Sequence, residues 1–153
     1  MTGLPRRLRR AIILGTTEED CTVVAGGQRG EAVYAAVFPR PRTERVSPGH
    51  LVAIADAADG PDLVVWRWFD AVVVGMEDGL VRLWEPGHGL VLAQPRDPGR
   101  VPRPGGRAYV SAGLPGADWW VAGRAVTHAE DAYVELKELE RFFTANHLWA
   151  RLT

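Results

Sequence analysis

The segment from Leu63 to Gln94, LVVWRWFDAVVVGMEDGLVRLWEPGHGLVLAQ, decides the fold class. It holds four short apolar runs, most of them rich in the β-branched and aromatic residues that favour strands. The runs are Leu63–Trp68, Ala71–Gly75, Leu80–Glu85 and Leu90–Gln94. Asp78-Gly79 suits a tight hairpin turn, and Pro86-Gly87 suits a type II turn. The segment therefore predicts consecutive antiparallel strands.

The same pattern of apolar runs and turn residues continues on both sides of this segment. The further predicted strands are Ala11–Thr16, Cys21–Ala25, Glu31–Phe38, His50–Ala55, Arg107–Ser111 and Trp119–Ala122. Short strands separated by turns about every ten residues are typical of all-β barrels and sandwiches. We therefore predict a mainly β chain, folded as a small antiparallel β-barrel or as two packed sheets. No internal repeat of fixed period is evident.

The C-terminal segment changes to a helical period. Four apolar residues share one stripe of a helical wheel: Ala132, Leu136, Leu139 and Phe143. Thr127 and Glu130 have the spacing of a capping box, and Asn146 tolerates the left-handed conformation that ends helices. These features predict an amphipathic helix from about His128 to Asn146, with a tail that packs on the sheet.

The predicted organisation has three parts. Residues 1–10 form a basic arm, residues 11–127 form a β domain, and residues 128–153 form the helix and tail packed on it. Two segments rich in Pro and Arg, residues 39–49 and 94–107, are predicted loops, because proline cannot donate to a strand ladder.

Composition narrows the class of protein. The chain of 153 residues is 46% apolar and 24% charged, as globular domains are, and no apolar run approaches the roughly 20 residues that a membrane helix needs. Cys21 is the single cysteine, so no intrachain disulfide forms, and a cytoplasmic location is expected. Arginine outnumbers lysine 17 to 1, which is typical of a GC-rich bacterial genome.

Charge is spread unevenly but defines no strongly basic groove. Residues 1–45 carry eight Arg and five acidic residues, a net +3, whereas residues 46–94 carry two Arg and seven acidic residues, a net −5. Because nucleic-acid binding depends on a basic surface, the electrostatic case for such a partner is weak.

The segment Val46–Ile54, VSPGHLVAI, resembles the strand found in small barrels of the KOW, Tudor and SH3-like kind and in OB-folds. It covers nine residues, and His50 stands where the KOW pattern commonly has Asp. The resemblance implies an SH3-like or OB-like barrel and a binding module for nucleic acid or peptides.

Alternation along two strands suggests a binding surface. Period-two spacing places Val64, Trp66 and Trp68 on the core face of their strand, with Arg67 opposite. In Leu80–Glu85 it places Arg82 and Trp84 on one face. If both strands lie in one sheet, Arg67, Arg82 and Trp84 form a cationic aromatic surface suited to stacking or carboxylate recognition.

Few other residues suggest a binding, catalytic or metal-ligating role. Trp119 and Trp120 point to opposite faces of a strand, so an exposed one, like Trp149 in the tail, would suggest a partner surface. Glu85 and His88 lie at the two ends of one turn, where they could act as acid and base with Asp70 nearby. The histidines are isolated and Cys21 has no cysteine partner, so we predict neither a metal site nor a cofactor.

Three functions remain open. The first is a non-catalytic interaction module that binds a protein partner, with binding residues predicted to be Arg67, Arg82, Trp84, His88, Trp119 and Trp149. The second is a nucleic-acid-binding protein that uses the Arg-rich segments 6–10, 40–45 and 96–107 together with an aromatic surface. The third is a small enzyme with a site near Glu85 and His88.

Overall fold

The computed structural model describes residues 4–36, 38, 46–57, 60–97, 99, 101–112, 119–125 and 133–152. The chain divides into two compact units. The first combines Met1–Arg67 with Leu136–Thr153, and the second is Trp68–Glu135. Where the sequence suggests one β domain, the second unit is thus inserted between the strands of the first and its C-terminal helix.

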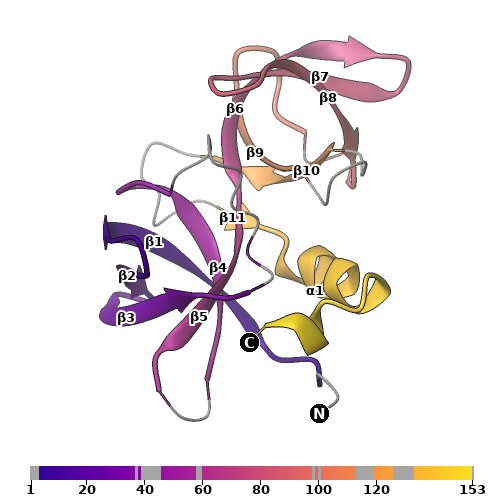
Figure 1. Cartoon of the computed structure of the whole chain (residues 1–153). Helices are drawn as coiled ribbons and strands as arrows, with labels where there is room; N and C mark the ends of the chain where they lie inside the picture. Colours follow the sequence, from indigo (N-terminus) through magenta and orange to yellow (C-terminus); the bar gives the residue numbers. More distant parts are fainter. Residues whose placement is uncertain are drawn as a thin grey trace. The chain divides into compact units, whose positions relative to one another are not determined.

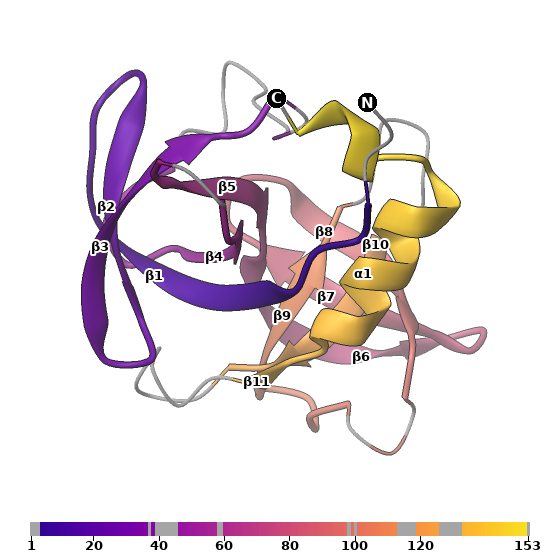
Figure 2. The same ribbon diagram turned by 90° about the horizontal axis from the view of Figure 1, so that it is seen from below.

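Five strands of the first unit close into a barrel (Figure 2). They are β1 (Leu8–Thr16), β2 (Asp20–Ala25), β3 (Gln28–Tyr34), β4 (Leu51–Ala55) and β5 (Asp62–Arg67). The order around the barrel is β1-β2-β3-β5-β4, and β4 pairs back with β1. All neighbours are antiparallel except β3 and β5, which run parallel.

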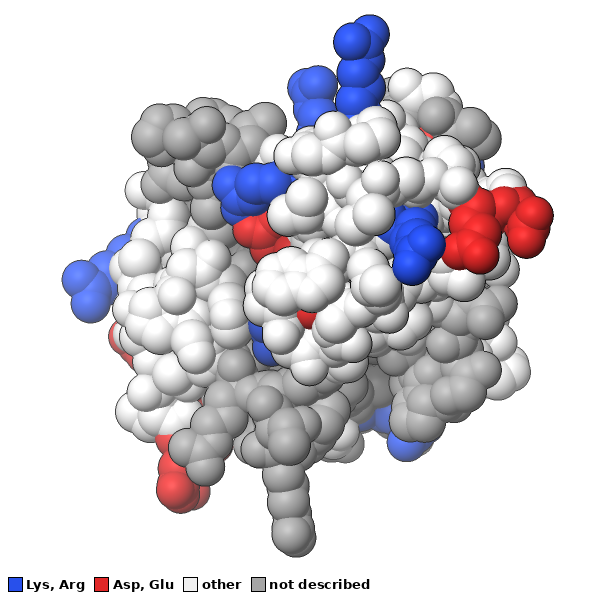
Figure 3. All heavy atoms as spheres, turned by 90° about the horizontal axis from the view of Figure 1, so that it is seen from above, with Lys and Arg blue, Asp and Glu red and all other residues white. Residues whose placement is uncertain are grey.

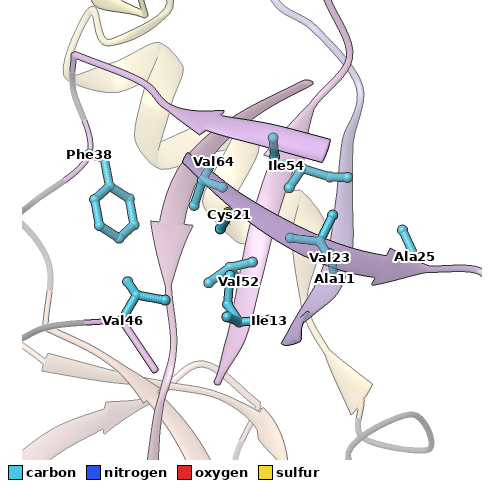
Figure 4. Packing of buried hydrophobic residues seen from close by; sticks show 11 residues of the cluster. Ala11, Ile13, Cys21, Val23, Ala25, Phe38, Val46, Val52, Ile54 and Val64 are labelled. Carbon is cyan, nitrogen blue, oxygen red and sulfur yellow. The ribbon is translucent and has the colours of Figure 1, made fainter. Parts of the chain in front are cut away.

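Alternate side chains from all five strands fill the interior of the first barrel (Figure 4). The cluster consists of Ala11, Ile13, Cys21, Val23, Ala25, Ala32, Phe38, Val46, Val52, Ile54 and Val64, each at most 9% exposed. Full burial of a Val, Ile or Phe side chain stabilises the fold by about 1.5–3 kcal/mol, so this cluster contributes substantially to the first unit's stability.

Helix α1 (Leu136–Ala145) and the 3-10 helix η3 (Trp149–Arg151) belong to the first unit, and α1 contacts β1 (Figure 2). Phe143 of α1 is fully buried, with its ring centroid 5.9 Å from that of Trp66 and 5.2 Å from that of Trp149. The backbone N–H of Ala36 donates to the carbonyl of Leu152 at 3.0 Å. The helix and tail therefore pack on the barrel.

The helix begins at Leu136 and not near His128, where the sequence placed its start. Tyr133–Val134 form a short strand, β11, which pairs with the strand that contains Gly123. The N–H of Glu135 then donates to the carbonyl of Ala122 at 2.7 Å. Pairing with a neighbouring strand has overridden the helical pattern there, while the predicted capping box of Thr127 and Glu130 lies outside the described residues.

The second unit forms another closed barrel of five strands (Figure 1). They are β6 (Phe69–Glu77), β7 (Leu80–Glu85), β8 (Gly89–Pro95), β9 (Arg107–Ser111) and β10 (Trp119–Arg124). The order is β6-β7-β8-β10-β9, with β9 pairing back to β6 and only β8 and β10 parallel. A tight turn joins β6 and β7, in which Asp78 and Gly79 both have positive φ. This is the predicted Asp-Gly hairpin.

The two barrels share one strand order, so the chain contains a structural repeat that was not evident from the sequence. Ala11–Gly15 (AIILG) and Ala71–Gly75 (AVVVG) occupy corresponding places in β1 and β6. Both strands carry a bulge immediately before the glycine, where the pairing register shifts. The likeness is confined to such short apolar stretches, which any strand could carry.

The predicted fold class is confirmed: the chain is mainly β, with small barrels and a C-terminal helix. One predicted strand, Glu31–Phe38, lies instead at Gln28–Tyr34, because the turn at Gly26 and Gly27 is tight and β3 starts at once after it. No helix among the described residues has the length and apolar character needed to cross a membrane.

Candidate binding surface on the second barrel

The outer side of β6, β7 and β8 carries a row of large apolar side chains that remain exposed. Strand pairing aligns Val72 with Trp84 and Trp84 with Leu90. In the next row, Arg82 pairs with Leu92 on one side and with Gly75, beside the bulged Val74, on the other. We call the six side chains on this outer side the apolar face: Val72, Val74, Arg82, Trp84, Leu90 and Leu92.

Alternation along the strands explains the geometry of this surface but not its composition. The residues that alternate with those of the apolar face point into the barrel: Val73, Val81, Leu83 and Ala93 are at most 2% exposed, and Val91 is partly buried. The five apolar members of the apolar face are between 37% and 55% exposed. A strand with one face in a core ordinarily carries polar residues on the other. Here both sides are apolar, and only the inner side is needed for folding.

The first barrel shows that the fold does not require apolar side chains at all of these positions. Its pairing register aligns Ile12 with Val24 and Val24 with Arg29, matching the Val72, Trp84 and Leu90 row. Thr22 aligns with Glu31, matching Arg82 and Leu92. The Thr22 hydroxyl lies 3.4 Å from a carboxylate oxygen of Glu31. The corresponding face of the first barrel is therefore mixed: Thr22, Arg29 and Glu31 are polar, whereas Ile12, Leu14 and Val24 are apolar.

Arg82 is the single charge of the apolar face. Its side chain is exposed, and no acidic side chain among the described residues forms an ion pair with it. Elsewhere in this unit the guanidinium of Arg107 contacts both carboxylate oxygens of Asp70, which raises the pKa of Arg107 further. Arg82 thus offers a positive charge framed by apolar groups.

Strand pairing does not place Arg67 on this surface. The predicted surface of Arg67, Arg82 and Trp84 requires β5 and β7 to lie in one sheet, whereas they belong to different barrels. The Arg67 guanidinium lies 3.5 Å from a ring nitrogen of His50. Of the three predicted residues, Arg82 and Trp84 are neighbours on one outer face.

A bulge also changes the predicted faces of β5. Ile54 pairs with Val64 and Ala53 pairs with Trp66, so Val65 is an extra residue. Val64 and Trp66 consequently point to opposite sides, contrary to simple alternation. Val64 enters the barrel core, and Trp66 packs against Phe142 and Phe143 of α1.

Glu85 and His88 meet in the turn between β7 and β8, as the sequence suggested. His88 Nδ1 lies 2.7 Å from a carboxylate oxygen of Glu85, whose side chain is only 7% exposed. The His88 ring packs edge-on against Phe69 and Trp119, with centroids 5.3 Å and 4.9 Å away. The positive φ of this turn falls on Gly89 and not on Gly87, so the turn is not the predicted type II.

This cluster of Glu85, His88, Phe69 and Trp119 is closely packed and does not include Asp70. Asp70 follows Phe69 along β6, so it points to the other side of the strand, where it pairs with Arg107. The geometry holds the turn in place next to the apolar face. Glu85 and His88 lie together as an acid and a base, but Asp70, the third residue of the enzyme hypothesis, is not beside them.

The other predicted binding tryptophans are largely covered. Trp149 is 6% exposed, and its indole N–H donates to the Thr144 hydroxyl at 2.9 Å, so it serves the first barrel and offers little to a partner. Trp119 is partly buried against Phe69, with ring centroids 5.5 Å apart. Trp120 is buried below the guanidinium of Arg96.

The described residues contain no cluster of three or more His, Cys, Asp and Glu side chains suited to a metal ion. Cys21 is buried. Burial raises the pKa of its thiol to about 11, and the charges of Asp20 and Glu31 act in the same direction against a hydrogen bond with Tyr34. A thiol that is protonated at neutral pH is a poor nucleophile.

Charged side chains are scattered over the face of the molecule seen in Figure 3, which shows separate basic and acidic residues among mostly uncharged ones. The second unit, Trp68–Glu135, carries six Arg and nine Asp or Glu, a net charge of −3. A polyanion would meet no concentrated basic surface in that view.

No protein-family model matches this chain, and no curated protein matches it significantly. Among solved structures, the chain is similar to a multidomain protein with nucleic acid binding domains from Streptococcus pneumoniae TIGR4. The identity is 12%, the TM-score is 0.27, and the similarity covers 83% of this chain and 47% of that one. This chain therefore spans about half the length of that protein, and so low a TM-score supports no argument about function.

Proposed function

We propose that this chain is a non-catalytic binding module and that the apolar face of the second barrel is its docking surface for a protein partner. The observation that carries the proposal is the contrast between the barrels. The six matching positions are Ile, Leu, Thr, Val, Arg and Glu in the first barrel, half of them polar, and Val, Val, Arg, Trp, Leu and Leu in the second, where five are apolar. Since both barrels close in the same way, the apolar face is not a consequence of folding.

The composition of the apolar face supports a protein partner. Contiguous exposed apolar patches on a small protein mark interaction sites. Tryptophan and arginine are the residues most enriched among those that dominate binding energy, and Trp84 and Arg82 lie two residues apart on β7. The aliphatic residues around them would exclude water from the contact. The proposal places the module in the cytoplasm, because its single cysteine gives no disulfide framework.

The strand order supports the position of the surface. We propose that each barrel is an OB-fold, a five-stranded barrel in which the outer face of the second and third strands contacts ligands. In the second barrel these strands are β7 and β8. They carry four of the six residues of the apolar face: Arg82, Trp84, Leu90 and Leu92.

Nucleic acid is the second candidate, because the same face of OB-folds also binds single strands by stacking bases on aromatic rings. Trp84 could serve as such a ring, with Arg82 beside it. Stacking proteins combine the ring with a basic groove that follows the phosphates. The net charge of −3 on the second unit and the aliphatic neighbours of Trp84 favour a protein.

The two candidates separate in a capture experiment. Tagged full-length chain is incubated with extract of its own cells, with and without nuclease, beside a Trp84→Ser/Leu92→Ser variant. A Val24→Ser variant, which alters the matching position of the first barrel, is the control. We expect a stoichiometric protein that survives nuclease, is retained by Val24→Ser and is lost from the double variant. Equal capture by all three chains would refute the proposed surface, and loss on nuclease treatment would favour nucleic acid.

A further inference from the structure

We propose that the partner presents a carboxylate to Arg82 from within an otherwise apolar segment. This inference rests on the proposed function and specifies the chemistry of the partner. It rests on the position of one charged side chain, Arg82, which lies among apolar side chains and faces Leu92 where the first barrel has Glu31.

Strand pairing puts Arg82 between apolar neighbours on both sides. Leu92 of β8 is its direct cross-strand neighbour, and Gly75 with the bulged Val74 lies opposite on β6. Trp84 follows two residues later on the same side of β7. Because Arg82 neighbours both Trp84 and Leu92, a partner that covers these two residues also contacts Arg82.

The two barrels differ at the pair of positions that Arg82 and Leu92 occupy in the second barrel. In the first barrel, the position of Leu92 is taken by Glu31, which lies within hydrogen-bond distance of Thr22, the counterpart of Arg82. The second barrel therefore has a cation in place of a hydroxyl and an aliphatic side chain in place of a carboxylate. Other arginines of the chain do receive acids from within it: Arg9 contacts Asp56 and Asp62 at 2.8 Å and 3.2 Å.

A partner that covers the guanidinium of Arg82 must supply a hydrogen-bond acceptor for it. A guanidinium that loses water without gaining an acceptor is strongly unfavourable, whereas its planar fork binds a carboxylate through two parallel hydrogen bonds. The chain supplies no acid to Arg82 from its described residues, so the acid comes from the partner. One positive charge among five apolar side chains fits one carboxylate better than a row of phosphates.

A pair of small probes tests this chemistry. 1-Naphthaleneacetate and the neutral 1-naphthaleneacetamide share one aromatic body and differ in charge, so each is titrated into ¹⁵N-labelled full-length chain while amide chemical shifts are followed. We expect both to shift amides of β7 and β8, with the carboxylate binding about tenfold more tightly, as a charge-assisted pair provides. Arg82→Gln should abolish that difference, and Arg29→Gln, an exposed arginine of the first barrel, should preserve it.

Other outcomes overturn the inference in distinguishable ways. If 1-naphthaleneacetate and 1-naphthaleneacetamide bound at β7 and β8 with equal affinity, the proposed carboxylate recognition would be refuted. The proposed docking surface would stand. Absence of shifts on β6–β8 with either probe would remove both the inference and the proposed surface. An oligothymidylate of 15 residues that bound at the same amides more tightly than either probe, and lost affinity steeply on added salt, would refute the inference. It would indicate that Arg82 binds the phosphates of a nucleic acid.

Discussion

The substitution Phe143→Ala tests whether the C-terminal helix is part of the first barrel. Phe143 has no exposed surface, and its ring contacts the rings of Trp66 and Trp149. Replacing a fully buried phenylalanine by alanine costs about 3–5 kcal/mol. We expect the free energy of unfolding of the first unit to fall by about 4 kcal/mol, a large part of the stability of any small domain.

Hydrogen exchange followed by mass spectrometry measures this loss segment by segment. Where exchange requires unfolding of the whole unit, a loss of about 4 kcal/mol accelerates it roughly a thousandfold. We expect that acceleration in peptides from β1 to β5, and protection close to wild type in peptides from β6 to β10, because the helix belongs to the first unit.

A matched change on the exposed side of α1 provides the control. Arg141 pairs with Glu138 and its side chain is 70% exposed, so Arg141→Ala should cost less than about 1 kcal/mol. If Phe143→Ala accelerated exchange equally in both barrels, or in neither, the assignment of the helix to the first unit would be refuted.

Three further predictions concern single residues. His88→Ala should cost about 1–3 kcal/mol of unfolding free energy in chemical denaturation, because it leaves the buried carboxylate of Glu85 without its imidazole; no change would show that the pair is not structural. Gly123→Ala should release the β10–β11 pairing in hydrogen exchange, since a Cβ there would collide with the backbone of β11, whereas Gly30→Ala, with open space around it, should not. The Cys21 thiol loses its proton near pH 8.5 in the unfolded chain and near 11 in the folded one, so stability should fall as pH rises between these values, and Cys21→Ala should show a smaller fall.

Alternation of buried and exposed residues predicted the candidate surface correctly in strands that are regular and have one face in the core. In β7, Val81 and Leu83 are buried while Arg82 and Trp84 are exposed, as period two requires. The same rule was wrong in β5, because a bulge at Val65 turns the next residue to the other face. A bulge has no reliable sequence signature, so the faces beyond it could not be assigned.

Features that depend on distant parts of the chain were not predictable. The helical pattern of the C-terminus is real from Leu136 onwards, but residues 133–134 are recruited as a strand by β10. No local sequence signal marks the insertion of the second unit between β5 and α1, or shows that Arg67 and Trp84 belong to different barrels. The difference between the two barrels on this face becomes visible only when β6–β8 are aligned with β1–β3, for which the AIILG and AVVVG stretches are the clue in the sequence.

The affinity of the captured partner for the wild-type chain, Trp84→Ser and Val24→Ser tests the proposed surface most directly. A tryptophan can bury about 150–250 Å². With 47% of Trp84 exposed, about 100 Å² remains for a partner to cover. At about 25 cal/mol per Å² this corresponds to about 2.5 kcal/mol, or roughly 70-fold in Kd. Titration calorimetry should show that weakening for Trp84→Ser and an unchanged Kd for Val24→Ser, whereas equal affinity of all three chains would contradict docking on β6–β8.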